Sequence, residues 1–73
     1  MKTLKELRIG ESGIIEHMKV SGALKRRFMD MGIIKGTEVK VIKIAPLGDP
    51  IEIEIRGYNL SVRKEDADNI EIK

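Results

Sequence analysis

Few side chains in this sequence could support acid–base, nucleophilic or metal chemistry. His17 is the only histidine and cysteine is absent, so no thiolate is available as a nucleophile or a metal ligand. Glu16 and Met18, on either side of the histidine, do not complete a ligand set. Glu52 and Glu54 alternate with isoleucines, which is typical of the solvated face of a strand and not of a buried acid–base pair. We therefore expect no enzyme, and no catalytic, cofactor-binding or metal-binding residues.

Basic side chains give a second kind of chemical signal. Residues 19–43 contain seven Lys and Arg against two Asp and Glu, whereas residues 49–73 contain four against seven. Such a cluster can neutralise phosphates, so a small barrel that binds RNA or single strands is an alternative function. Proteins that bind single-stranded nucleic acid also need exposed aromatic rings on which the bases stack. This chain has one Phe, one Tyr and no Trp. Nucleic acid is therefore disfavoured as a partner. The residues of the basic patch are Lys25, Arg26, Arg27, Lys35, Lys40 and Lys43.

The segment Ala45–Pro50 is a candidate docking surface for another protein. Two prolines and a glycine restrict its backbone around one apolar side chain, Leu47. A stiffened loop loses little conformational entropy when such a side chain docks. The same composition also fits a hairpin loop shaped by turn chemistry alone, and both interpretations stay open. The hypothetical partner-binding surface combines the loop with basic side chains assumed to lie beside it: Leu47, Gly48, Asp49, Lys25, Arg26 and Lys43.

An amphipathic helix is predicted over about residues 21–31. Ser21 is placed to cap its start by accepting a hydrogen bond from an amide of the first turn. Gly32 is placed where a helix end takes a left-handed conformation. The apolar side chains have the i, i+4, i+7 spacing of one helix face and should anchor the helix to the core: Leu24, Phe28 and Met31.

Most of the remaining chain is predicted to form strands. Twelve isoleucines and four valines favour them. Gly36 marks a turn before the second strand and Gly57 a tight turn within a hairpin. Apolar residues change face between Val41 and Ile42, which indicates either a β-bulge or a sharply coiled strand with both sides partly covered. The strands are expected at residues 14–18, 37–44, 51–56, 58–63 and 70–72. We therefore predict a mainly β fold, a small barrel of about five strands with one inserted helix.

The length and composition predict a single domain over residues 1–73. The first residues carry a charge every two or three positions, unlike a signal peptide. No apolar run has the length of a membrane span, so no direct membrane insertion is expected. The absence of cysteine fits a reducing compartment. These features lead us to expect a soluble intracellular protein.

Three blocks of the sequence resemble the FeoA family, in the family's order and spacing: residues 26–39 (RRFMDMGIIKGTEV), 45–50 (APLGDP) and 55–63 (IRGYNLSVR). The resemblance implies an SH3-like barrel and a non-enzymatic role in bacterial ferrous iron uptake. The implied partner is the FeoB permease, whose cytoplasmic region carries a GTPase domain. It also implies a cytoplasmic protein that this partner recruits to the inner face of the membrane, with Fe(II) linked through the partner and no tightly bound cofactor.

Overall fold

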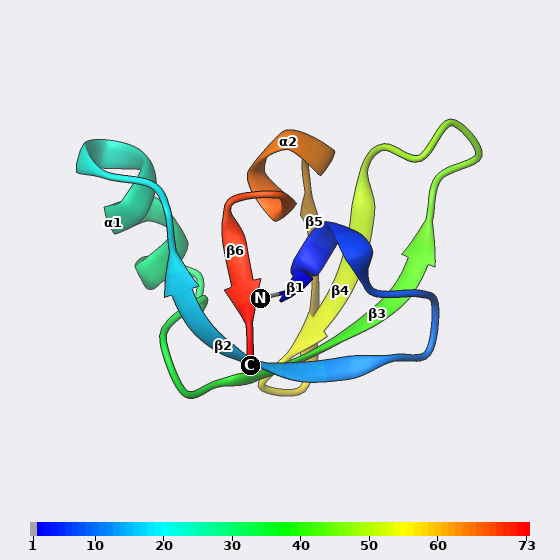
Figure 1. The fold of residues 1–73 in the computed structure, drawn as a ribbon, viewed down its shortest axis with the longest axis horizontal. Coiled ribbons are helices and arrows are strands. Elements are labelled where there is room, and N and C mark those ends of the chain that lie inside the picture. Colours follow the sequence, from blue (N-terminus) through cyan, green and yellow to red (C-terminus); the bar gives the residue numbers. More distant parts are fainter. Residues whose placement is uncertain (1) are drawn as a thin grey trace.

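The computed structural model describes residues 2–73, and Met1 lies outside the described residues. Six antiparallel strands form one sheet in the order β1-β6-β2-β3-β4-β5, with α1 inserted between β2 and β3 (Figure 1). The expected mainly β fold with one inserted helix is therefore confirmed. The elements are β1 (Lys2–Thr3), the 3₁₀ turn η1 (Leu4–Glu6), β2 (Ser12–Met18), α1 (Gly22–Asp30), β3 (Glu38–Ile44), β4 (Ile51–Ile55), β5 (Tyr58–Val62), α2 (Lys64–Ala67) and β6 (Ile70–Ile72).

The core lies on the face of the sheet to which alternate strand residues point. In β4, Ile51, Ile53 and Ile55 are all buried, whereas the glutamates between them are half-buried or exposed. Val39 and Val41 of β3 stand opposite Ile55 and Ile53 and are also buried. Such cross-strand pairs of branched side chains stabilise a sheet. The strict alternation therefore predicts correctly which side of this hairpin faces inward.

Of the two interpretations of the change of face in β3, the bulge is confirmed. Val41 pairs with Ile53, but the next pair is Lys43 with Glu52, so the register shifts by one residue at Ile42. A bulge inserts one residue into one strand and increases its local twist. After Val41, the shift therefore reverses which alternate residues of β3 point toward the core. This reversal accounts for the change of apolar positions from Val41 to Ile42 in the sequence.

The end of α1 has the hydrogen bonds of a Schellman motif. The Ile33 amide donates to the Phe28 carbonyl at 2.9 Å, and the Gly32 amide donates to the Met29 carbonyl at 3.0 Å. The motif requires a left-handed residue, and Gly32 has φ of +92°. Phe28 and Ile33 are both buried, which adds the apolar contact that often accompanies this motif.

The start of α1 differs from the expectation. Ser21 occupies the N-cap position in an extended conformation, but its hydroxyl makes no capping hydrogen bond. Gly22 has φ of +65°, so the backbone leaves Ser21 in a direction other than the one that an N-cap hydrogen bond requires. The cap expected at Ser21 was wrong.

The N-terminal part contains strand structure that the sequence pattern did not reveal. β1 is only two residues long and pairs Lys2 with Ile72 of β6, which makes six strands in place of five. β2 begins at Ser12, two residues before the expected start, so Gly13 lies inside a strand. A Cβ added at Gly13 would lie 2.3 Å from Ile72 Cγ2. Gly13 therefore permits a close approach of β2 and β6.

Two turns that contain glycine connect β4 to β5 and α1 to β3. Arg56 and Gly57 have φ of 52° and 85°, the two positive values of a type I′ turn, which matches the twist of the β4–β5 hairpin. Gly36 has φ of +89°, and its amide donates to the Ile15 carbonyl at 2.8 Å. This bond fixes the segment between α1 and β3 against β2.

Candidate partner-docking surface

The loop between β3 and β4 presents one apolar side chain to solvent. Leu47 is 93% exposed, more than any other large apolar residue among residues 2–73. The loop is nevertheless ordered by its own backbone, because the Gly48 amide donates to the Ala45 carbonyl at 2.7 Å and the Ala45 amide donates to the Pro50 carbonyl at 3.1 Å. Leu47 is therefore held on a defined turn that projects from the barrel.

Asp49 fastens this loop to a distant element. Its carboxylate accepts a hydrogen bond of 3.0 Å from the backbone N–H of Lys64, the first residue of α2. The first amides of a helix have no partner inside the helix, so the carboxylate satisfies one of them. Asp49 thus fixes the position of the loop and is less available to contact a partner than the sequence suggested.

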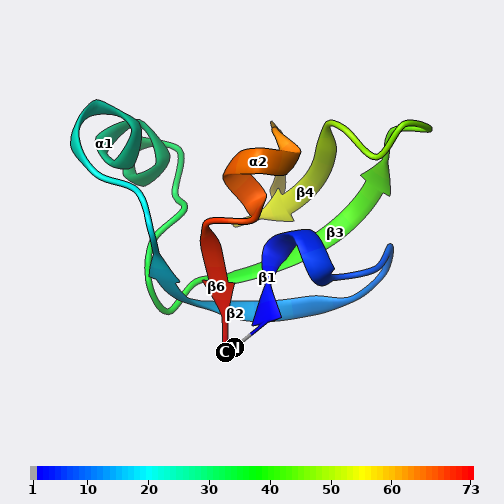
Figure 2. The same ribbon diagram turned by 45° about the horizontal axis from the view of Figure 1, so that its top comes forward.

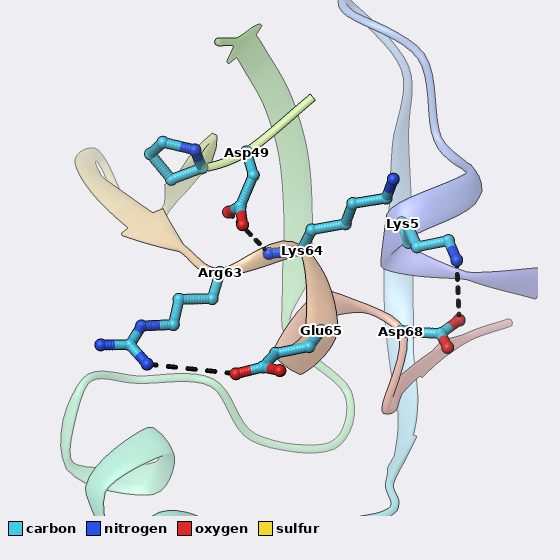
Figure 3. A pocket seen from close by; sticks show the side chains of 7 residues that line it. Lys5, Asp49, Arg63, Lys64, Glu65 and Asp68 are labelled. Carbon is cyan, nitrogen blue, oxygen red and sulfur yellow. Dashed lines mark hydrogen bonds and ion pairs between the residues drawn. The ribbon is translucent and has the colours of Figure 1, made fainter. Parts of the chain in front are cut away.

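An open groove of about 790 Å³ lies between the loop, α2 and η1 (Figure 3). Each of its acids already has a partner: Asp68 lies 3.8 Å from Lys5, Glu65 lies 4.0 Å from Arg63, and Asp49 binds the Lys64 amide. The Lys64 side chain runs away from Asp49 towards the side of the groove where Lys5 lies. The lining residues are Lys5, Asp49, Pro50, Arg63, Lys64, Glu65 and Asp68. The groove is solvated and balanced in charge, unlike an enclosed catalytic cavity.

The basic residues assigned to this surface do not all lie there. Lys43 stands two residues before the loop, at the end of β3. Lys25 and Arg26 are exposed on α1, and α1 and the loop lie at opposite ends of the molecule's longest axis (Figures 1 and 2). The assumption that α1 borders the loop was wrong, because sequence proximity does not determine which side of a barrel an inserted helix covers.

Sequence reasoning missed the basic side chain that does lie beside the loop. The Lys64 ammonium lies next to Gly48, and the Asp49–Lys64 hydrogen bond joins residues 15 positions apart. No periodicity or spacing signals a contact of this kind, because it depends on how α2 packs.

The fold also divides the basic patch of residues 19–43. Lys40 stands opposite Glu54 and Lys43 opposite Glu52 in the β3–β4 ladder, and cross-strand pairs of opposite charge attract each other. Lys19 lies 3.3 Å from Glu71. The remaining cations are confined mainly to α1 and the segment after it: Lys25, Arg26, Arg27 and Lys35.

The structural residues of α1 lie as follows. Phe28 is buried in the core, while Leu24 and Met31 are half-buried and pack against it. Within residues 2–73 no three His, Cys, Asp or Glu side chains gather as metal ligands would, and His17 is exposed on β2. None of the helices in this described part is long and apolar enough to cross a bilayer.

Comparisons with known proteins agree with this architecture. The iron(II) transport protein A of Clostridium thermocellum is 38% identical in sequence, and its solution structure superposes with a TM-score of 0.94 over 99% of this chain and 44% of that one. The FeoA of Stenotrophomonas maltophilia, a prokaryotic SH3-domain protein crystallised with zinc, is 25% identical with a TM-score of 0.86, covering 100% of this chain and 91% of the other. The expected SH3-like barrel is therefore confirmed.

A relative from Porphyromonas gingivalis is a fusion of Fe(2+) transport protein A with the Fe(2+) transporter FeoB. It is 37% identical over 70 residues, which span 96% of this chain but only 8% of the fusion protein. The FeoA domain family matches residues 2–73. This match and the relatives above establish that the chain belongs to the FeoA family, whose members are associated with ferrous iron transport.

Proposed function

We propose that this protein is a non-enzymatic accessory factor of ferrous iron uptake that acts by binding the cytoplasmic region of a FeoB-type permease. The observation that carries the proposal is the Porphyromonas gingivalis fusion, in which a segment similar to this chain is covalently joined to FeoB. Two modules in one polypeptide meet at a high effective concentration. In this proposal, a family member that is not fused to the permease binds its cytoplasmic region, at the inner face of the membrane.

The β3–β4 loop supports this proposal as the contact surface. Leu47 combines high exposure with a backbone held by hydrogen bonds. Apolar anchors that enter a pocket dominate the energy of many interfaces, and a preorganised anchor loses less entropy on binding. Lys64 lies beside the loop, and its charge can increase the rate of association with an acidic partner.

Iron is assigned to the partner in this proposal. The Stenotrophomonas maltophilia protein was crystallised with zinc. Within residues 2–73 of this chain, no three His, Cys, Asp or Glu side chains gather as metal ligands would. Divalent transition metals bind tightly where several such groups converge. The accessory role therefore rests on contact between proteins, with Fe(II) linked to it through the permease.

Nucleic-acid binding has less support from the structure. Opposed glutamates accompany two of the basic side chains of β3, and Tyr58 uses its hydroxyl to bind α1. A surface that binds phosphates strongly loses affinity steeply as salt rises. Titration of the chain with single-stranded RNA at low and at high salt tests this alternative, because affinity that comes from phosphate contacts should fall as the salt concentration rises.

The test of the proposal is a binding measurement between this chain and the isolated cytoplasmic region of the permease from the same organism. Leu47→Asp should lower the affinity by about tenfold or more, the loss typical of an interface anchor. Met29→Asp is the matched control, because Met29 is also an exposed apolar residue, 49% accessible, but lies on α1 at the other end of the molecule. Failure of the unaltered chain to bind the permease region at micromolar concentrations would reject the proposal.

A further inference from the structure

Strand β5 forms one edge of the sheet, and no strand within residues 2–73 pairs with its outer side. The other edge strand, β1, has only two residues, and so short a strand offers little backbone for pairing. β5 has five residues, contains no charged residue and no proline, and pairs with β4 without a bulge. Charges, prolines and bulges are the features that usually protect an edge strand. The edge of β5 is therefore open to a further strand.

The register of β4 and β5 identifies the backbone groups that point outward from this edge. A hairpin with a two-residue turn closes on a hydrogen-bonded pair, which here is Ile55 with Tyr58. Hydrogen-bonded and non-hydrogen-bonded pairs alternate from that point, so the N–H and C=O groups of Asn59 and Ser61 point away from β4. Neither backbone bonds to another segment within residues 2–73. Two donors and two acceptors thus lie along the free edge at the spacing of a strand.

A groove of about 360 Å³ lies at this edge, between β5 and α1. Ser61 and Val62 both line it. Because successive side chains of a strand point to opposite faces, the groove reaches the edge of β5 itself. The wall formed by α1 includes the half-buried apolar side chains of Leu24 and Met31. The Tyr58 hydroxyl donates to the Met31 carbonyl and holds the end of α1 beside the start of β5, so the open edge is recessed next to a helix.

The charges that line the groove balance. Arg27 and Arg63 are accompanied by Glu65 and Asp66, and Arg63 lies 4.0 Å from Glu65. Charge therefore does not select the occupant, and the selection rests on the backbone groups and the apolar wall. A row of outward N–H and C=O groups is complementary to an extended peptide backbone. Neither a lipid headgroup nor a phosphate backbone provides that row of partners.

We propose that the edge of β5 binds an extended segment of a partner protein by β-strand addition, in the groove beside α1. The inference rests on the proposed function for the identity of the partner, because it assigns the segment to the cytoplasmic region of the permease. It places this contact apart from the β3–β4 loop. Backbone hydrogen bonds to Asn59 and Ser61 fix the register of the added strand, and its alternate side chains face Leu24 and Met31. The segment that fits has apolar side chains at every second position.

A second copy of the chain fits this edge less well than a flexible segment does. The outward groups lie in a concave groove beside α1. Two folded barrels meeting edge to edge would have to fit this concave surface into an identical one, whereas a two-fold interface requires a self-complementary patch. A single extended segment can enter the groove as one strand. The shape of the edge therefore favours a segment of another protein.

Amide hydrogen exchange, measured by NMR on the chain alone and with the permease's cytoplasmic region, tests the pairing directly. In the free chain the amides of Asn59 and Ser61 should exchange quickly. The Leu60 amide, which bonds to β4, should already be protected and serves as the internal control. Binding should slow exchange at Asn59 and Ser61 at least tenfold. This alternation is the signature of an added strand.

Proline substitution on the same edge provides the binding test. Ser61→Pro removes one outward N–H and leaves the bonds between β4 and β5 in place, and an edge strand tolerates proline where its N–H faces solvent. Ser61→Pro should bind the permease region at least tenfold more weakly than Ser61→Ala, which keeps the amide. Circular dichroism and thermal unfolding check the fold. If Ser61→Pro unfolds, Asn59→Pro compared with Asn59→Ala takes its place.

The outcomes separate this inference from the proposed function. Absence of binding by the unaltered chain rejects both. Binding that leaves the Asn59 and Ser61 amides unprotected, or that is equally strong for Ser61→Pro and Ser61→Ala, rejects strand addition and leaves the proposed function standing. Protection of both amides in the free chain, together with a dimer in sedimentation, identifies a second copy as the occupant and overturns the assignment.

Discussion

The Tyr58 hydroxyl donates a hydrogen bond to the backbone carbonyl of Met31 and so joins β5 to the C-terminal end of α1. The last carbonyls of a helix lack partners within the helix, and this phenol satisfies one of them. The contact links the β4–β5 hairpin to a helix 27 residues earlier in the chain. It is a tertiary constraint on an element that otherwise extends from the side of the barrel (Figure 1).

Tyr58→Phe removes this hydrogen bond and keeps the ring. The free energy of unfolding should fall by about 0.5–1.5 kcal/mol, the usual net contribution of one hydrogen bond. Urea denaturation followed by circular dichroism measures the change. Ser61→Ala is a suitable control, because Ser61 is exposed on the same strand. An unchanged unfolding midpoint in Tyr58→Phe would show that this hydroxyl does not stabilise α1.

Substitutions at Gly32 and Gly36 should separate backbone strain from steric crowding. Both glycines have φ near +90°, so an added Cβ strains the backbone at either site. At Gly32 the added atom would also lie 3.0 Å from the Tyr58 hydroxyl, whereas at Gly36 no atom lies within 4 Å. Gly32→Ala should therefore destabilise more than Gly36→Ala, and Gly32→Val should cost well over 1 kcal/mol, more than the average of about 1 kcal/mol for a substitution.

Adding Tyr58→Phe to Gly32→Ala provides the check on this interpretation. Removal of the hydroxyl oxygen relieves the crowding, so the two changes together should cost less than the sum of their separate effects. Thermal or urea unfolding of the four proteins gives the coupling energy. Additive effects would leave backbone strain as the whole explanation at Gly32.

Phe28→Ala should show how strongly α1 depends on the core. Phe28 is 4% exposed, and truncation of a buried phenylalanine costs about 3–5 kcal/mol. Arg26→Ala, on the exposed side of the same helix, should change stability by no more than about 0.5 kcal/mol. Chemical denaturation of both variants measures the difference. Equal losses would contradict the orientation of the helix.

Fe(II) binding by the isolated chain should be weak or absent. His17 is exposed, and residues 2–73 contain no cluster of three potential ligands around it or elsewhere. Anaerobic titration calorimetry with Fe(II) should detect no stoichiometric site, and His17→Ala should leave the titration unchanged. A one-to-one site that disappears in His17→Ala would contradict the assignment of iron to the partner.

Sequence patterns predicted the features that depend on neighbouring residues. The change of face at Ile42 revealed the bulge, and the alternation of β4 revealed its buried side, because both follow from the two-residue period of a strand. The bond between Asp49 and Lys64 and the distance of Lys25 from the β3–β4 loop depend on how separate elements pack. The uncapped Ser21 shows that a favourable residue type does not guarantee the backbone geometry that a cap requires.

The pairing of Lys2 with Ile72 brings the two ends of the described chain side by side, at the bottom of the view in Figure 2. The β3–β4 loop, which carries Leu47, projects at the upper right of the same view, away from both ends. A polypeptide tether attached at either end would therefore leave from one point and would not cover the loop. Covalent linkage to a larger protein would raise the local concentration of the barrel while leaving the loop free to rotate into contact. The geometry thus makes the tethered and the free-standing forms of such a barrel compatible with the same docking surface.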